Sequence, residues 1–172
     1  VKRVGEMLEI KELQIEDAKE LQKIRLQALI KYPYAFGASY EEESKWDVSV
    51  YEDRIRSKGM FYFGAFFDGM LVGMIALVVN VRPKIRHRAM VQAVYVDEMF
   101  QSRGIGGMLL VKAIEKACEL KTIEQVELSV VTEQSAAFAL YQKNGFEIYG
   151  KEYHAMKIGS RYYDEYLMVK LL

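Results

Sequence analysis

Residues 94–110 constrain this chain most, because they predict a strand, a glycine-rich turn and a helix in direct succession. An apolar, β-prone run, Val94-Tyr95-Val96, ends at two acidic residues. The turn that follows consists of Gln101, Ser102, Arg103, Gly104, Ile105, Gly106 and Gly107. Glycine lets a backbone N–H group approach a phosphate closely, and the dipole at a helix N-terminus favours negative charge there. The segment therefore predicts a site for a phosphorylated ligand.

The spacing of the glycines selects among phosphate-binding motifs. A dinucleotide fingerprint needs a third glycine where this chain has Leu109. A P-loop needs a lysine and a serine or threonine after its second glycine, and this turn has neither. The remaining pattern, Gln101-x-x-Gly104-x-Gly106, resembles the pyrophosphate-binding motif of the GCN5-related N-acetyltransferases, which bind acetyl-CoA. An ordinary strand-to-helix turn is the alternative interpretation of this segment alone.

A second motif lies further along the chain, in residues 134–146. This segment resembles the later motif of the same family, Asn-x-x-Ala-x-x-Leu-Tyr-x-Lys-x-Gly-Phe. The positions that match in register are Ala137, Leu140, Tyr141, Lys143, Gly145 and Phe146. The frequent asparagine of the family is Gln134 here, whose carboxamide reaches further. Two motifs in the order of the family identify the chain as resembling an acetyl-CoA-dependent N-acetyltransferase.

Hydrophobic periodicity and turn residues predict the order of the elements. Strands are expected over residues 8–13, 60–67, 71–81, 89–96, 125–131, 146–153 and 162–171. Helices are expected over residues 16–29, 41–57, 106–121 and 135–143. Hairpin strands followed by β-α-β-α-β units predict an α/β fold with a mixed, mostly antiparallel sheet flanked by helices, as in the acetyltransferase fold. With only two prolines and no Ser/Gly-rich linker, residues 1–172 are expected to form a single N-acetyltransferase domain.

The resemblance implies a role for each motif residue. The backbone of Val94, Tyr95 and Val96 would bind the pantetheine arm, and an N–H group near Val94 would face the thioester oxygen. The turn 101–107 would bind the pyrophosphate, with Arg103 adding charge, and Gln134 would contact the pantetheine. Tyr141 would be the general acid that protonates the departing thiolate, since a phenol is protonated at neutral pH.

The general base is left open by the sequence. Some family members place a glutamate on the strand before the glycine turn, at the position that Met90 occupies here. Glu98 is expected to be an exposed turn residue, and Glu41, Glu42 and Glu43 are expected to form a solvated helix face. A chain of water molecules to bulk solvent is the alternative. The two histidines, His87 and His154, have no second ligand at metal-binding spacing, so no metal site is predicted.

Composition limits the other function classes. Lysine plus arginine and aspartate plus glutamate number 24 each, which argues against a nucleic-acid-binding protein. The single cysteine, Cys118, allows no internal disulfide, so a cytoplasmic location is expected. Cys118 lies in a predicted helix and is expected to be buried in the protein core. No apolar run reaches the roughly 20 residues of a membrane span.

The acceptor is expected to be an amine on a small molecule or a peptide, including a protein N-terminus. Aromatic residues gather in segments that border the acceptor site in this family, and they suit either a cationic amine or plain packing. They are Tyr32, Tyr34, Phe36, Tyr40, Trp46, Tyr153, Tyr162 and Tyr163. A non-catalytic acyl-CoA-binding module is the alternative function, and edge strands near the C-terminus would allow a homodimer.

Overall fold

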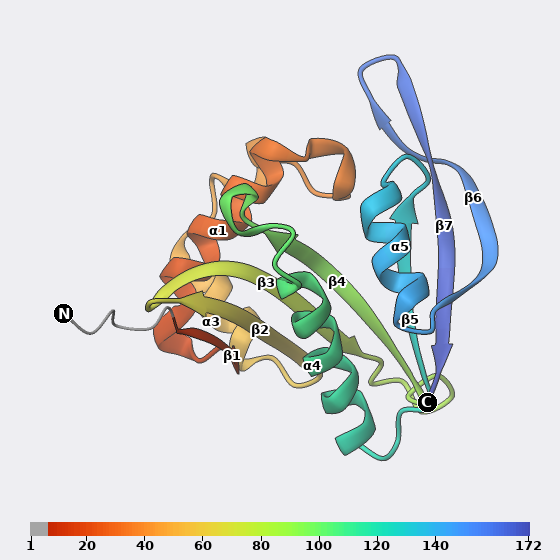
Figure 1. The fold of residues 1–172 in the computed structure, drawn as a ribbon, viewed down its shortest axis with the longest axis horizontal. Helices are drawn as coiled ribbons and strands as arrows, with labels where there is room; N and C mark the ends of the chain where they lie inside the picture. The colour runs from red at the N-terminus through yellow and green to blue at the C-terminus, as the bar shows by residue number, and fades with distance from the viewer. Residues whose placement is uncertain (1–6) are drawn as a thin grey trace.

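The computed structural model describes residues 7–172, which build a seven-stranded sheet in the order β1-β2-β3-β4-β5-β7-β6 (Figure 1). The strands are β1 (Leu8–Glu12), β2 (Met60–Phe67), β3 (Met70–Val79), β4 (Arg88–Val96), β5 (Gln125–Val131), β6 (Glu147–Ile158) and β7 (Arg161–Leu171). Neighbouring strands are antiparallel except β4 and β5, which are parallel. This confirms the mixed, mostly antiparallel sheet predicted from the sequence.

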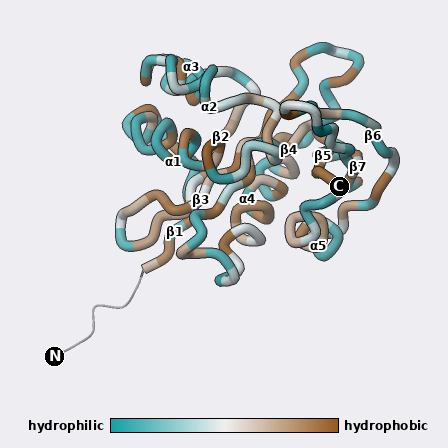
Figure 2. The backbone as a smooth tube through the Cα atoms, turned by 90° about the horizontal axis from the view of Figure 1, so that it is seen from above, coloured by the Kyte–Doolittle hydropathy of each residue, from teal (hydrophilic) through white to brown (hydrophobic). Residues whose placement is uncertain are grey.

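Helices cover both faces of the sheet (Figure 2). They are α1 (Ala18–Lys31), α2 (Tyr40–Glu43), α3 (Val48–Arg56), α4 (Ile105–Glu119) and α5 (Ser135–Lys143). One core cluster joins α1 and α3 to one face of the sheet, through residues such as Leu21 and Tyr51. A second cluster joins α4 and α5 to the other face, through residues such as Leu109 and Tyr141. The apolar stripes of the helices thus place α1 and α3 opposite α4 and α5.

The sheet is split between its two parallel strands. β4 and β5 pair only where residues 88–90 face residues 125–127, and beyond that point they diverge (Figure 1). β4 also carries a β-bulge against β3, because Gln92 pairs with Ala76 and Tyr95 pairs with Met74. Two residues of β4, Ala93 and Val94, therefore face one residue of β3. A bulge bends its strand and redirects its backbone groups, and here it does so beside the split.

Several expectations about individual elements were wrong. The helix expected over residues 41–57 is two helices, because α2 ends at Glu43 and the Asp47 side chain caps the start of α3 by accepting from the backbone N–H of Ser49. β6 continues to Ile158 rather than ending at residue 153. Cys118 is exposed on α4 rather than buried in the core. No helix in the described part of the chain is long and apolar enough to cross a membrane.

Candidate active site

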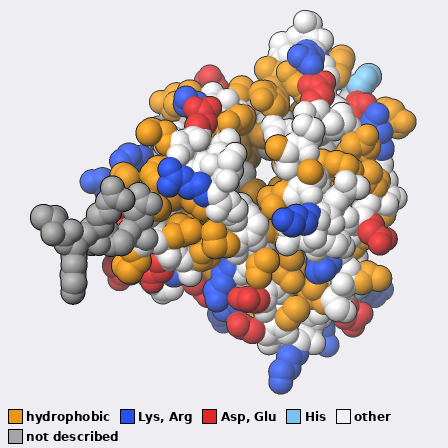
Figure 3. Space-filling model, viewed as in Figure 1, with side chains coloured by type: hydrophobic (Ala, Val, Ile, Leu, Met, Phe, Trp, Pro, Cys, Tyr) orange, Lys and Arg blue, Asp and Glu red, His pale blue; other side chains and the backbone are white. Residues whose placement is uncertain are grey.

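A cavity of about 610 Å³ occupies the split between β4 and β5. Its walls include Val91 to Val94 of β4 and Ser129 to Val131 of β5. Ala137 and Tyr141 of α5 line it from one face of the sheet, whereas Arg25, Trp46 and Arg54 line it from the side of α1 and α3. In the space-filling view the surface is hollowed between these two parts of the molecule (Figure 3). The cavity therefore offers two approaches to one point on the β4 backbone.

Tyr141 lies at the α5 end of this cavity. It is only 5% exposed, and its ring packs edge-on against Phe146, with ring centroids 6.1 Å apart. Burial raises the pKa of the Tyr141 hydroxyl above its usual value of 10.0, and no charge or hydrogen bond contributes to the shift. The phenol is therefore protonated throughout the physiological pH range and has a proton to donate. Gln134, the residue before α5, lines the same end of the cavity.

The glycine turn joins the end of β4 to the start of α4. Gly104 has a φ of +78° and Ser102 a φ of +60°, so the turn needs left-handed backbone twice. The first hydrogen bond of α4 is donated by the N–H of Met108 to the carbonyl of Gly104. The N–H groups of residues 105–107 therefore have no acceptor within the helix. A helix N-terminus of this kind binds anions. These positions agree with the phosphate-binding role that the resemblance implies.

Two residues of the turn have structural tasks that the sequence did not reveal. A Cβ atom at Gly106 would lie 3.3 Å from Cδ2 of Leu140, so this glycine lets α4 and α5 approach closely. The Gln101 carboxamide donates to the carbonyl of Val96 at 2.9 Å and to the Tyr32 hydroxyl at 3.3 Å, which fixes the turn to β4. Arg103 makes no salt bridge with the described residues; its guanidinium lies 5.3 Å from the ring centroid of Phe100 and remains able to meet a phosphate.

The bulge on β4 exposes backbone to the cavity. Ala93 has a φ of +54°, a strained conformation for a residue with a side chain, and such strain is concentrated at functional sites. Val94 lines the cavity. Tyr95 instead points into the core beside α1; its buried hydroxyl finds no hydrogen-bond partner among residues 7–172, and burial raises its pKa to about 12. Val96 packs toward α4.

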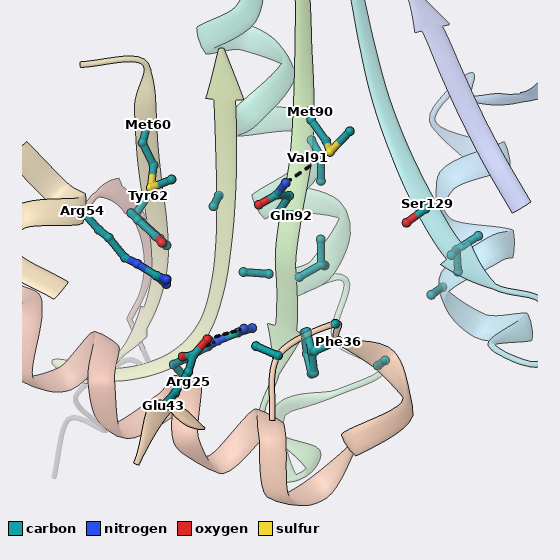
Figure 4. Close-up of a pocket in the computed structure, with 18 of the residues that line it drawn as sticks. Arg25, Phe36, Glu43, Arg54, Met60, Tyr62, Met90, Val91, Gln92 and Ser129 are labelled. Carbon is teal, nitrogen blue, oxygen red and sulfur yellow. Dashed lines mark hydrogen bonds and ion pairs between the residues drawn. The ribbon is translucent and has the colours of Figure 1, made fainter. Parts of the chain in front are cut away.

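The α1 end of the cavity contains a buried ion pair. Glu43 is 1% exposed, so the expectation of a solvated helix face is wrong for this residue. Its carboxylate accepts from Nε and Nη2 of Arg25 at 3.0 and 2.9 Å (Figure 4). It also accepts from the Tyr51 hydroxyl at 3.0 Å. Burial alone would raise the pKa of Glu43, but the hydrogen bonds and charge of Arg25 outweigh it and lower the pKa. Glu43 is thus ionised and already holds three donors.

Sequence reasoning missed several polar residues that line the cavity, namely Arg25, Arg54, Gln92, Ser129 and Glu165. One signal was present for Arg25, because it follows Leu21 by one helical turn and so interrupts the apolar stripe of α1. Met90 lines the cavity where a base was sought, and its sulfur accepts from the Gln92 amide at 3.2 Å.

Of the other carboxylates considered as possible bases, Glu42 lines the cavity and Glu98 does not. Glu42 accepts from the backbone N–H of Ser39, and Glu98 is an exposed turn residue, as expected, that pairs with Lys31 at 2.9 Å. Of the aromatic set, Phe36 and Trp46 line the cavity, and Tyr34 stacks on Tyr163 with centroids 6.0 Å apart.

His154 is exposed and stacks on Tyr162, away from the cavity. No group of three or more metal-binding side chains occurs within residues 7–172.

Comparisons with known proteins agree with this geometry. The model of the Acetyltransferase (GNAT) family matches residues 21–146, more than half of the chain. The L-amino acid N-acetyltransferase AaaT of Escherichia coli is 30% identical over 125 residues, 71% of this chain and 75% of that protein. The spermidine N(1)-acetyltransferase of Thermoplasma acidophilum is 30% identical over 150 residues, 82% of this chain and 89% of that protein.

A solved structure gives the same result for the whole fold. The crystal structure of an acetyltransferase of the GNAT family from Streptococcus pneumoniae superposes with a TM-score of 0.86 at 26% identity. The match covers 96% of this chain and 99% of that one. The two motifs, the split sheet and these matches together place the chain in the GNAT family of acetyltransferases.

Proposed function

We propose that this chain transfers the acetyl group of acetyl-CoA directly to a primary amine inside the split between β4 and β5. The observation that carries the proposal is the cavity, which joins the α4 and α5 face of the sheet to the α1 and α3 face beside the bulge at Ala93. Acetyl-CoA enters from the first side and the amine from the second. Both substrates then meet without a covalent enzyme intermediate.

The turn and β4 would hold acetyl-CoA. The N–H groups of residues 102–107 and the Arg103 guanidinium bind the pyrophosphate, and the β4 backbone and Gln134 bind the pantetheine arm. The bulge leaves Ala93 and Val94 opposite a single residue of β3, and we assign the N–H of Val94 as the donor to the thioester oxygen. A fixed donor aimed at developing negative charge is commonly the largest catalytic contribution of a site.

Tyr141 would be the general acid. The amine nitrogen attacks the thioester carbon, the carbon–sulfur bond breaks, and the thiolate receives the Tyr141 proton as coenzyme A leaves. A buried phenol with a raised pKa keeps this proton until the thiolate forms. The tyrosine is then reprotonated from solvent through the cavity.

The attacking amine must lose a proton, and Glu165 is the carboxylate we assign to this task. Glu165 lies on β7 opposite Val131 of β5 and lines the cavity. Unlike Glu43, it forms no salt bridge within residues 7–172, so its oxygens are free to accept. A water molecule between Glu165 and the amine would serve the same purpose.

The names of two relatives indicate the chemical class of the acceptor. One relative is named for L-amino acids and another for spermidine, and both molecules carry primary amines. We therefore propose a primary amine on a small molecule, with a protein N-terminus as the second acceptor class.

Thiol release from acetyl-CoA across a panel of amines tests the proposal. Release that depends on the acceptor, with the acetylated amine identified by mass spectrometry, is the expected result. The competing function is a non-catalytic acyl-CoA-binding module, favoured only by the lack of an acidic residue at Met90. Binding of acetyl-CoA without acceptor-dependent thiol release would support the module and refute the enzyme.

A further inference from the structure

Two charged side chains that line the cavity, Arg54 of α3 and Glu165 of β7, make no salt bridge within residues 7–172. The Arg25 guanidinium is neutralised by Glu43, because it donates two hydrogen bonds to the Glu43 carboxylate. Arg54 of α3 lines the same end of the cavity but makes no salt bridge to any carboxylate in residues 7–172. Of the two arginines that line the cavity, only Arg54 is without a salt bridge to the described residues, while Glu42 and Glu165 place negative charge elsewhere along the lining.

The position of Arg54 is fixed rather than free. Its guanidinium carbon lies 4.6 Å from the ring centroid of Trp46, and Trp46 in turn packs on the buried Tyr51 at 6.3 Å. The Arg54 side chain lies beside Met60 and Tyr62 of β2, across β4 from Ser129 (Figure 4). A guanidinium held against an aromatic face presents its remaining N–H donors in a defined plane.

The neighbour Arg56 shows what an ordinary surface arginine on this helix does. Arg56 turns away from the cavity and pairs with Glu52 and Asp53, at 3.6 and 3.5 Å. Arg54 lies two residues earlier, on the other side of α3, and lines the cavity together with Met60, Tyr62 and Ala76. A charge in a cavity interacts with a ligand more strongly than a charge on the open surface, because less water surrounds it.

We propose that Arg54 binds a carboxylate of the acceptor, so that the substrate is a small primary amine that also carries a carboxylate. This inference rests on the proposed function and specifies its acceptor. A guanidinium matches a carboxylate with two parallel hydrogen bonds, which gives both affinity and orientation. A polyamine would instead bring a second cation next to Arg54, and like charges in such a site discriminate against the wrong ligand.

Matched pairs of acceptors test the inference in the wild-type protein. Each pair consists of an amino acid and the amine left after its decarboxylation, such as leucine with 3-methylbutylamine, and spermidine is added as a polyamine. We expect kcat/KM to be about 10- to 100-fold higher for the member with the carboxylate, the usual effect of a charge-assisted hydrogen bond. Equal values, or a preference for the amine without the carboxylate, would overturn the inference.

Variants assign the preference to Arg54. Arg54→Gln is expected to remove it by raising KM for the amino acid about 10- to 100-fold, with KM for acetyl-CoA unchanged. Arg54→Lys keeps the positive charge but loses the planar guanidinium that can donate two parallel hydrogen bonds. This variant is expected to retain part of the preference for acceptors with a carboxylate. Arg56→Gln makes the same change outside the cavity and is expected to behave as wild type. If the preference for carboxylate-bearing acceptors survives Arg54→Gln in a protein with the circular dichroism spectrum of wild type, Arg54 is not the residue that binds the carboxylate.

Binding separates this inference from the proposed function. Calorimetry of the amino acid against the protein saturated with coenzyme A needs no turnover. Amino-acid binding that depends on Arg54, without thiol release for any amine, would refute the enzyme and keep the carboxylate site. Thiol release with polyamines that is unchanged by Arg54→Gln would support the acetyltransferase function and refute the carboxylate site.

Discussion

Glu43→Gln should be among the most destabilising single substitutions on the surface of this cavity, although it removes only a charge and no volume. The Glu43 side chain is 1% exposed and that of Arg25 is 12% exposed, so water screens this pair little. Removing one partner of a buried pair leaves an uncompensated charge and costs about 3–5 kcal/mol. With a urea m-value of about 2 kcal/mol/M, the unfolding midpoint should fall by about 1.5–2.5 M.

Glu133→Gln provides a matched control. Glu133 also accepts two hydrogen bonds from an arginine, Arg161, at 2.9 Å, but the two side chains are 52% and 62% exposed. An exposed pair contributes about 0–1 kcal/mol, so this variant should unfold near the wild-type midpoint. Urea unfolding of both variants at pH 7, followed by circular dichroism, measures the difference. Equal midpoints would refute the conclusion that Glu43 is a buried structural anion.

The same pair predicts a pH dependence. The pKa of Glu43 is lowered in the folded protein from its ordinary value of 4.5, so its contribution to stability is complete above about pH 4.5. The contribution is lost as the pH falls through the folded pKa, because the unfolded chain then binds a proton that the folded one does not. The stability gap between wild type and Glu43→Gln should therefore narrow below pH 4.5 and stay constant between pH 6 and 8. A gap that widens on acidification would contradict this assignment.

Three further substitutions test the site. Tyr141→Phe should lower kcat by about 100-fold or more while the calorimetric affinity for acetyl-CoA stays nearly unchanged, and equal turnover would remove Tyr141 from the mechanism. Glu165→Gln should lower kcat at neutral pH and approach wild type as the pH nears the pKa of the acceptor amine, where the base is not needed; a constant ratio across the pH profile would argue against a base. Gly104→Ala forces a side chain into a φ of +78° and should cost about 1–2 kcal/mol in urea unfolding, and an unchanged midpoint would show that the turn relaxes.

The sheet could be predicted from the sequence because its signals are local. The turn between β2 and β3 illustrates this: Asp68 and Gly69 have φ values of 47° and 82°, the left-handed pair that an Asp-Gly hairpin turn requires. The continuous apolar runs on both sides of this turn, Met60–Phe67 and Met70–Val79, then form the two strands of the hairpin. The extension of β6 was missed because its pairing with β7 shifts register between Glu152 and Met156, around a left-handed His154, and a register shift breaks the period of two.

The acceptor end of the site could not be predicted, since it depends on contacts between distant segments. Glu43 lies in a run of acidic residues that looks solvated, yet it is buried by Arg25, 18 residues earlier, and by Tyr51, eight residues later. Cys118 directly follows the buried Ala117 on α4, and successive residues of a helix point in different directions, so the Cys118 side chain faces the solvent. The cofactor end was more accessible to sequence reasoning because both motifs are continuous in the chain.

A crystal structure with bound acetyl-CoA would locate the pyrophosphate and the thioester relative to the glycine turn and the split sheet. We expect the pyrophosphate on the N–H groups of residues 102–107 and the thioester in the split between β4 and β5. We also expect the thioester oxygen within hydrogen-bond distance of the Val94 N–H and the sulfur beside the Tyr141 hydroxyl. Acetyl-CoA bound outside the split, or with its thioester remote from Val94 and Tyr141, would contradict this expectation.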